Sequence, residues 1–156
     1  MTNHWVDFQN SDCILIMGSN PASNHPVSFK WITKAVEKGA KLICVDPRFT
    51  QSAAKSHIYA PLRSGTDIAF LGGMIKYILD HNLIQEEYVK SYTNAGFLVN
   101  PAFKLPGDNS GVFSGLTGET YDKATWSYQT DAEGKVKKDS TLQDPYCVYQ
   151  LLKKQY

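Results

Sequence analysis

A short apolar run that ends abruptly at a glycine is the feature that most constrains this chain. Residues 13–17 read CILIM, which has the length and composition of a buried strand. Gly18 ends the run, and the next eight residues, 19–26, are small, polar or proline, as is typical of a loop. A helical pattern follows from Val27. The stretch therefore predicts a strand, a loop and a helix in succession.

A second run of the same kind predicts a neighbouring parallel strand. Residues 41–45 read KLICV, and Gly39 is a natural end for the helix between the two runs. Open α/β sheets bind ligands at the carboxyl ends of such strands, at the start of the loops that follow them. Three further elements are expected: a short strand over 57–60, a strong helix over 68–80 that Thr66 or Asp67 begins, and a helix over about 85–91.

The character of the sequence changes after Tyr92. Glycine and proline interrupt residues 94–118, and a hairpin is predicted from 126–130 and 135–138 around the turn at 131–134. The fold class expected is α/β: a Rossmann-like, mainly parallel sheet with helices on both faces, plus an irregular appendage with a β-hairpin. The expected division is an α/β domain over 1–93, an irregular insertion over 94–143 and the start of a truncated helix over 144–156.

Charge and composition exclude several classes of function. The net charge of +1 gives no reason to expect nucleic acid or an anionic membrane as partner. No apolar run approaches the roughly 20 residues of a membrane span, and the first residues, MTNHWVDF, do not resemble an export signal. The three cysteines, Cys13, Cys44 and Cys147, lack metal-binding spacing and are expected to be buried thiols. The four histidines are scattered, so we expect no metal ligand and no catalytic residue in this stretch.

The loop after the first run has the chemistry of a phosphate site. Gly18 allows the backbone to turn and to approach a ligand closely. The start of the following helix offers free N–H groups and a partial positive charge. Neutral hydrogen-bonding side chains are supplied by Ser19, Asn20, Ser23 and Asn24. The single glycine is a poor match to the nicotinamide fingerprint, and a polar loop without a ligand is the alternative interpretation.

Two more loops add charged groups. Asp46 can accept hydrogen bonds from ribose hydroxyls, Arg48 can bind a phosphate, and Thr50 adds a hydroxyl. After Gly65, the carboxylate of Asp67 can accept both N1–H and the exocyclic amine of guanine, a pair of donors that adenine lacks. The alternatives are a simple turn at 46–48 and a simple helix cap at Asp67.

Taken together, these loops resemble a known family. The segments GSNPASNHP, VDPRFTQSA and APLRSGTDIAF are similar to the domain of molybdenum or tungsten oxidoreductases that binds molybdopterin guanine dinucleotide. The segments MTNHW, GAKLICVDPRFT, YAPLRSGTDIAFLGG and TLQDPYCV resemble the catalytic (alpha or major) subunit of respiratory formate dehydrogenases. The similarity extends over essentially the whole chain, including 94–144.

The resemblance implies a role for each loop. It places the dinucleotide phosphates and the pterin side at Gly18, Ser19, Asn20, Ser23 and Asn24. It places the guanosine ribose and phosphates at Asp46 and Arg48, and the guanine end at Gly65 and Asp67.

The resemblance also implies a parent activity, the oxidation of formate to CO2 at a bis-molybdopterin guanine dinucleotide centre with Mo or W. The family's cysteine cluster for an iron–sulfur centre and its cysteine or selenocysteine metal ligand are missing from this sequence. We therefore expect an internal fragment that binds one cofactor arm and is inactive alone. The implied partners are the rest of the catalytic subunit, an iron–sulfur subunit and a membrane cytochrome subunit, on the periplasmic (outer) face of the inner membrane.

Three alternatives stay open at this point. The chain can be a stand-alone guanine-nucleotide-binding module, or a packing and interaction domain without a ligand. It can also be a fragment of another molybdopterin reductase, acting on nitrate, polysulfide or arsenate.

Overall fold

The computed structural model describes residues 2–156, which form two compact units, residues 2–69 and Phe70–Tyr156. The first unit contains a parallel sheet, and the second contains helices, turns and a small antiparallel pair of strands. The mixed α/β class predicted from the sequence is therefore confirmed. The domain bounds predicted at 93/94 and 143/144 stay predictions.

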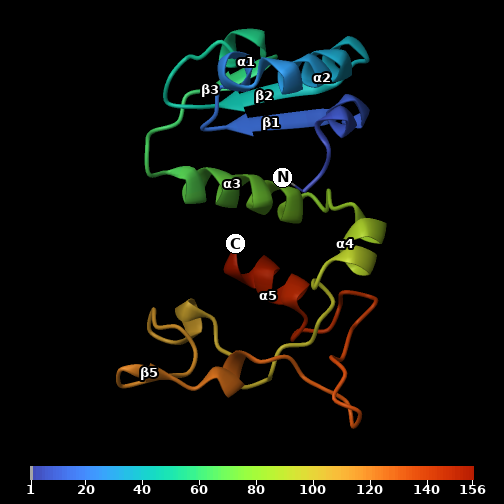
Figure 1. Cartoon of the computed structure of the whole chain (residues 1–156). Coiled ribbons are helices and arrows are strands. Elements are labelled where there is room, and N and C mark those ends of the chain that lie inside the picture. The colour runs from blue at the N-terminus through green and yellow to red at the C-terminus, as the bar shows by residue number, and fades with distance from the viewer. Residues whose placement is uncertain (1) are drawn as a thin grey trace. The chain divides into compact units, whose positions relative to one another are not determined.

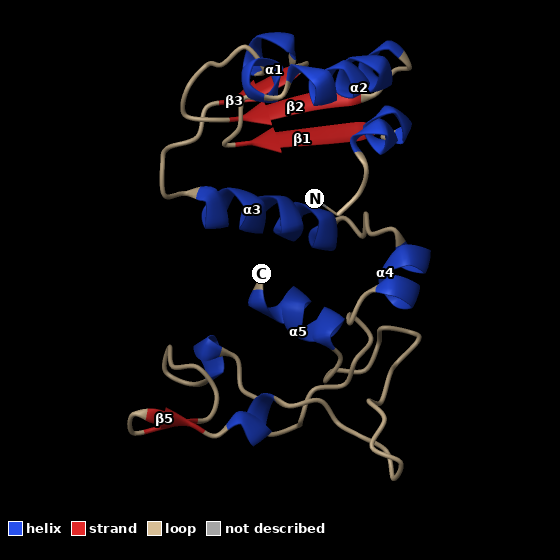
Figure 2. Cartoon of the chain, in the orientation of Figure 1, coloured by secondary structure: helices blue, strands red, loops and turns tan. Residues whose placement is uncertain are grey.

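The first unit is built on three parallel strands in the order β1 (Cys13–Met17), β2 (Lys41–Val45) and β3 (Ile58–Ala60), as Figures 1 and 2 show. The first two have the predicted bounds, and the third is one residue shorter than predicted. Met17 pairs with Val45, and Val45 pairs with Ala60. The three strands thus end level with one another, and the loops that follow them begin at one edge of the sheet.

Helices precede and follow β1. The 3-10 helix η1 (Trp5–Asn10) begins at His4, whose ring Nδ1 accepts from the N–H of Val6. α2 (Pro26–Glu37) begins one residue before the helical pattern expected from Val27, and Gly39 beyond its end has a φ of +104°. The predicted loop 19–26 is wrong in two respects, because it contains a helical turn, α1 (Pro21–Asn24), and because Pro26 already belongs to α2. Proline suits the first position of such a turn, since its missing N–H has no partner to lose.

The core of the first unit lies between the sheet and α2. Side chains alternate along a strand, so Ile16, Leu42 and Cys44 point to the same face, where they pack against Ile32 of α2 and Ala53 of the short η2 (Ala53–Lys55). The opposite face carries Leu15 and Ile58, which are 40% and 54% exposed. Val45 also lies on this opposite face and is 0% exposed, so the face towards α2 supplies most, but not all, of the apolar burial that holds these strands.

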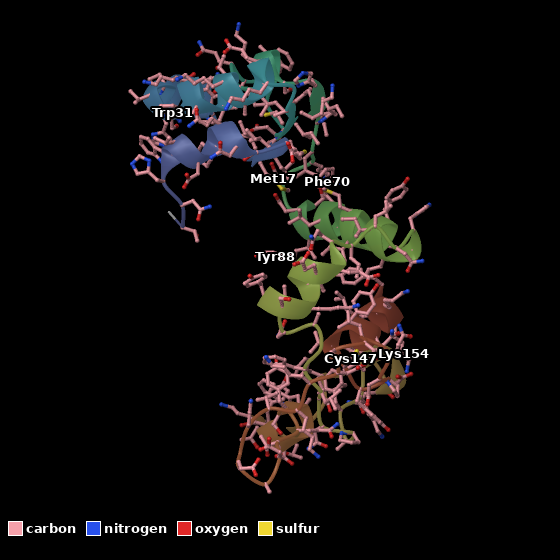
Figure 3. The ribbon with its side chains drawn as sticks, turned by 90° about the vertical axis from the view of Figure 1, so that its right-hand side faces the viewer. Met17, Trp31, Phe70, Tyr88, Cys147 and Lys154 are labelled. Atoms are coloured by element: carbon pink, nitrogen blue, oxygen red, sulfur yellow. The ribbon has the colours of Figure 1, made fainter. Side chains whose placement is uncertain are left out.

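The second unit depends less on regular structure. Its helices are α3 (Asp67–Asp80), whose first residues belong to the first unit, α4 (Glu86–Tyr92) and α5 (Val148–Gln155). Two short 3-10 helices, η3 (Pro106–Asp108) and η4 (Lys123–Trp126), lie in the irregular part. Its core contains Leu79, Leu142, Cys147 and Tyr149, with Cys147 labelled in Figure 3. Single bridges join Phe97 to Lys138, Leu98 to Cys147 and Val99 to Tyr128.

The predicted hairpin is only partly formed. Thr130 and Val136 make a single antiparallel bridge, and the Asp131 carboxylate accepts from the N–H groups of Glu133 and Lys135. The paired strands lie elsewhere, in β4 (Leu116–Thr117) and β5 (Thr120–Tyr121), around Gly118 with a φ of +62°. None of the helices in the described residues is long and apolar enough to cross a membrane.

Candidate functional site

The carboxyl edge of the sheet brings the first two predicted loops together. The N–H of Gly18 donates to the carbonyl of Val45 (2.9 Å), and the N–H of Asp46 donates to that of Ala60 (3.3 Å). Gly18 has a φ of +61°, in the left-handed region that favours glycine. The backbone therefore turns at the point that the sequence predicted, and a Cβ at Gly18 would meet no atom within 4 Å.

A hydrogen-bonded network joins the loop after β1 to the segment after β2. The side-chain oxygen of Asn20 accepts from both the N–H (3.2 Å) and the hydroxyl (2.9 Å) of Ser52, and the Ser52 hydroxyl accepts from the N–H of Ala22 (3.0 Å). Asn20 donates to the Ser23 hydroxyl (2.8 Å), which donates to Gln51 (2.7 Å). Two side chains predicted to face a ligand are thus engaged within the protein.

Asp46 and Arg48 differ sharply in exposure. Asp46 is 8% exposed, and its carboxylate accepts from the N–H of Arg48 (2.8 Å), which closes a tight turn. The Tyr59 hydroxyl donates to the carbonyl of Asp46 (2.9 Å). The guanidinium of Arg48 is exposed and forms no ion pair among the described residues. This turn therefore presents the positive group of Arg48 to solvent, whereas Asp46 is mostly buried and one of its carboxylate oxygens is engaged within the turn.

Cys44 precedes this turn in β2, and Thr50 follows it along the chain. The hydroxyl of Thr50 accepts from the N–H of Ala53 (3.2 Å). Burial raises the pKa of the Cys44 thiol; the Thr50 hydroxyl lowers it in part and the nearby Asp46 raises it, so the neutral thiol is favoured over the thiolate. Cys147 is also buried, as predicted, whereas Cys13 is exposed, so the expectation of three buried thiols is wrong for Cys13.

The third predicted loop stands apart in its contacts. Gly65 has a φ of +86°, and Asp67 is the first residue of α3 and is exposed. The Thr66 hydroxyl donates to the carbonyl of Arg63 (2.6 Å), so Thr66 closes a turn there. Among the described residues, no hydrogen bond joins Gly65 or Asp67 to the other two loops. Ser19 and Asn24, in the first loop, are exposed, and their side chains make no hydrogen bond to any residue in the described range 2–156.

Three residues of this edge were missed by sequence reasoning: Gln51, Ser52 and Arg63. The chain has only two arginines, Arg48 and Arg63, and both follow strands of the parallel sheet at its carboxyl edge. That count and spacing were available in the sequence. The burial of Ser52, which is 0% exposed, could not be predicted from the sequence, because it depends on the approach of the two loops.

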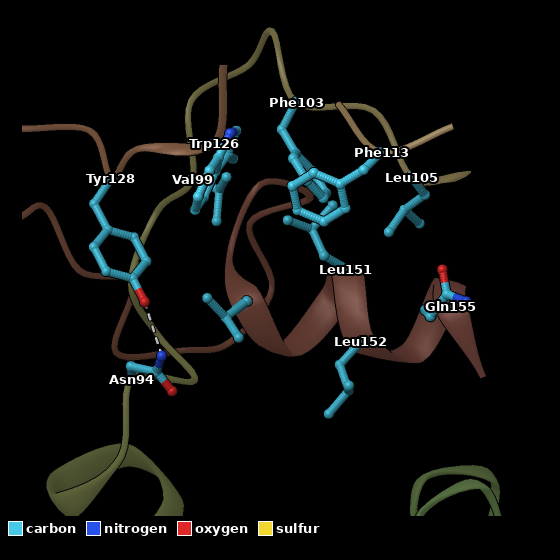
Figure 4. Close-up of a pocket in the computed structure, with 11 residues that line it drawn as sticks. Asn94, Val99, Phe103, Leu105, Phe113, Trp126, Tyr128, Leu151, Leu152 and Gln155 are labelled. Atoms are coloured by element: carbon cyan, nitrogen blue, oxygen red, sulfur yellow. Dashed lines mark hydrogen bonds between the residues drawn. The ribbon is translucent and has the colours of Figure 1, made fainter. Parts of the chain in front are cut away.

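Two mostly apolar cavities differ in their relation to this edge. A cavity of about 330 Å³ in the second unit is lined by aromatic and aliphatic side chains, with the amide of Asn94 bonded to the Tyr128 hydroxyl (Figure 4). It has no charged lining residue, so it does not suit a phosphate. A mostly apolar groove of about 520 Å³ in the first unit runs from Trp5 along β1 and reaches Ser19 and His25. This groove adjoins the polar loop at the end of β1.

Comparison with known proteins decides the family. The family model described as molybdopterin oxidoreductase matches residues 1–135. The chain belongs to the molybdopterin oxidoreductases. It is 54% identical to the formate dehydrogenase subunit alpha of Megalodesulfovibrio gigas over all of this chain, and 50% identical to the nitrate-inducible formate dehydrogenase major subunit of Escherichia coli over 98% of it. It spans about 15% of the length of each relative.

A solved structure is also similar. The acetylene hydratase of Pelobacter acetylenicus aligns with 94% of this chain and 17% of its own, with a TM-score of 0.49 and 23% identity. Membership of the family implies a molybdopterin cofactor with Mo or W. The carboxyl edge fits the phosphate-bearing part of such a cofactor, since it combines open backbone at Gly18, exposed Arg48 and Arg63, and uncharged donors at Ser19 and Asn24.

Proposed function

We propose that this chain is the segment of a formate dehydrogenase catalytic subunit that binds one guanine dinucleotide arm of the molybdopterin cofactor. The observation that carries the proposal is the level carboxyl edge, where three polar loops begin side by side and both arginines of the chain follow strands. The similarity to formate dehydrogenase alpha and major subunits supports the parent activity.

The residues would act by binding and orienting. Gly18 leaves the backbone open to a pyrophosphate, and Arg48 offers a fork of N–H donors to its oxygens. Asp46, held by the N–H of Arg48, would accept from a ribose hydroxyl. Asp67 would accept from N1–H and the amine of guanine. When bound in its bis form with Mo or W, the cofactor supplies the two-electron oxidation of formate to CO2.

The remaining parts of the proposal concern the parent protein. The iron–sulfur centre and the metal ligand would lie in the rest of the catalytic subunit, so this segment alone would not turn over formate. An iron–sulfur subunit and a membrane cytochrome subunit would accept the electrons, with the complex at the outer face of the inner membrane. The names of the relatives, subunit alpha and major subunit, support the existence of further subunits.

Binding of GDP against ADP tests the guanine assignment. We expect the chain to bind GDP more tightly than ADP by about 10-fold or more, because one charge-assisted hydrogen-bond pair is worth roughly 1.5–3 kcal/mol. Asp67→Ala should remove the preference between the bases and leave ADP binding unchanged. The matched control is Asp7→Ala, which removes an acidic side chain from the first turn of η1 in the same unit. Calorimetric titration that finds equal affinity of the unaltered chain for both nucleotides would overturn the assignment.

A further inference from the structure

Ser52 is the most deeply buried polar residue at the carboxyl edge, and the proposed ligand contacts do not use it. Its side chain is 0% exposed, although serine is usually found at the surface. A buried hydroxyl is costly unless its hydrogen bonds are made, and here both roles are filled. The hydroxyl donates to Asn20 and accepts from the N–H of Ala22. Ser52, in the segment after β2, therefore fixes the start of α1 through its hydrogen bond with Ala22.

The side chain of Asn20 also has its hydrogen-bonding groups occupied within the protein. Its side-chain oxygen has two lone pairs, and the N–H and the hydroxyl of Ser52 occupy both. Its amide donates to Ser23, whose hydroxyl proton goes to Gln51. An Asn20 oxygen used in this way has no acceptor capacity left for a ligand. The four residues Asn20, Ser23, Gln51 and Ser52 are called the loop clamp below.

We infer that the loop clamp is a positioning device: Asn20 and Ser52 fix the loop after β1, so that the side chains of Ser19 and Asn24 meet the phosphates beside Gly18, where no side chain blocks their approach. This inference rests on the proposed function. It changes the role of Asn20 from ligand contact to positioning residue. A loop fixed in advance loses less conformational entropy when the ligand binds, so the clamp raises affinity without touching the nucleotide.

The first test is Ser52→Ala in the full chain, with GDP as the probe. We expect a loss of GDP affinity of about 5- to 20-fold, and faster hydrogen exchange at the Ala22 amide, which loses its acceptor. Ser52→Thr, which restores a hydroxyl, should recover most of both. The matched control is Ser56→Ala, because the Ser56 hydroxyl donates to the Ala53 carbonyl within its own segment (2.7 Å) and does not reach the loop after β1.

A double-mutant cycle measures whether the losses of GDP affinity caused by the two substitutions are additive, as independent structural effects would be. If Asn20 and Ser52 act through one contact, Asn20→Ala combined with Ser52→Ala should weaken GDP no more than the stronger single change. If Ser52→Ala fails to fold, Gln51→Ala removes the outer bond of the clamp from an exposed position. A smaller loss of affinity, about 2- to 5-fold, is expected there.

The outcomes separate this inference from the proposed function. GDP binding by the unaltered chain, with no loss in Ser52→Ala or additive losses in the double variant, overturns the clamp's role and leaves the proposed function standing. No GDP binding by the unaltered chain overturns the proposed function and, with it, the positioning role. Unchanged exchange at the Ala22 amide in Ser52→Ala overturns the clamp itself, with or without a nucleotide.

Discussion

Each of the two units of this chain is stabilised internally by a different kind of contact. In the first unit, β1–β3 form a continuous ladder, and one sheet face buries Ile16, Leu42 and Cys44 against α2. In the second unit, single bridges and side chain to main chain bonds replace the ladder. A ladder fixes the register of every strand at once, whereas each isolated bridge depends on its own local turn. The ladder is therefore what can align three loops for one ligand.

Removing core volume should break the first unit only. Leu42 is 1% exposed at the centre of the sheet, so Leu42→Ala should lower the free energy of unfolding by about 3 kcal/mol. Hydrogen exchange read by mass spectrometry will follow residues 2–69 and 70–156 separately. Leu15→Ala, at a position that is 40% exposed in the neighbouring strand, is the control and should cost less than about 1 kcal/mol. Equal loss of protection in both units would show that they do not unfold independently.

Adding volume should break the second unit. A Cβ at Gly96 would lie 2.5 Å from the carbonyl oxygen of Asp139, a backbone atom that cannot rotate away. Gly96→Ala should therefore destabilise the second unit by about 2 kcal/mol, in the range seen for overpacking. Gly73→Ala is the control, since a Cβ there meets nothing within 4 Å. Chemical denaturation that shows the two alanine variants to be equally stable would contradict this account of the packing.

The smallest expected effect is on acid stability. The Asp139 carboxylate accepts from the Thr141 hydroxyl (2.6 Å) and from the N–H groups of Thr141, Gln143 and Asp144, and these bonds lower its pKa from 3.8 to about 2. A carboxyl whose pKa is lower in the folded state than in the unfolded state stabilises the fold at pH values above its unfolded-state pKa. That stabilisation is lost as the pH falls through the folded-state pKa. The second unit should therefore lose stability between about pH 4 and pH 2.

Asp139→Asn is the matched variant for this pH effect. The amide keeps an acceptor oxygen but cannot titrate, so the variant should be less stable at neutral pH and should lack this part of the acid transition. Thermal melting at several pH values measures the difference. A transition of the same size in both proteins would assign the acid sensitivity to other carboxyls.

Much of the first unit could be predicted from local sequence. The apolar runs predicted the bounds of β1 and β2, the helical pattern from Val27 predicted the start of α2 to within one residue, and Gly18 was predicted to turn and has a positive φ. Each of these features depends on a few consecutive residues. The irregular second unit was harder, because its hairpin signal at 131–134 formed one bridge, and the paired strands lie around Gly118. Two-residue strands carry too little periodicity to detect.

The sequence by itself determined the order of the strands along the chain, the polar loops after them and the resemblance that the family comparison confirmed. Only the tertiary structure decided how those polar groups are used. Asn20 and Ser52 are 32 residues apart, and they meet because parallel strands end level at one edge of the sheet. Hydrogen bonds between loops depend on this long-range register. Residue type alone therefore could not tell a positioning side chain from one left free for a ligand.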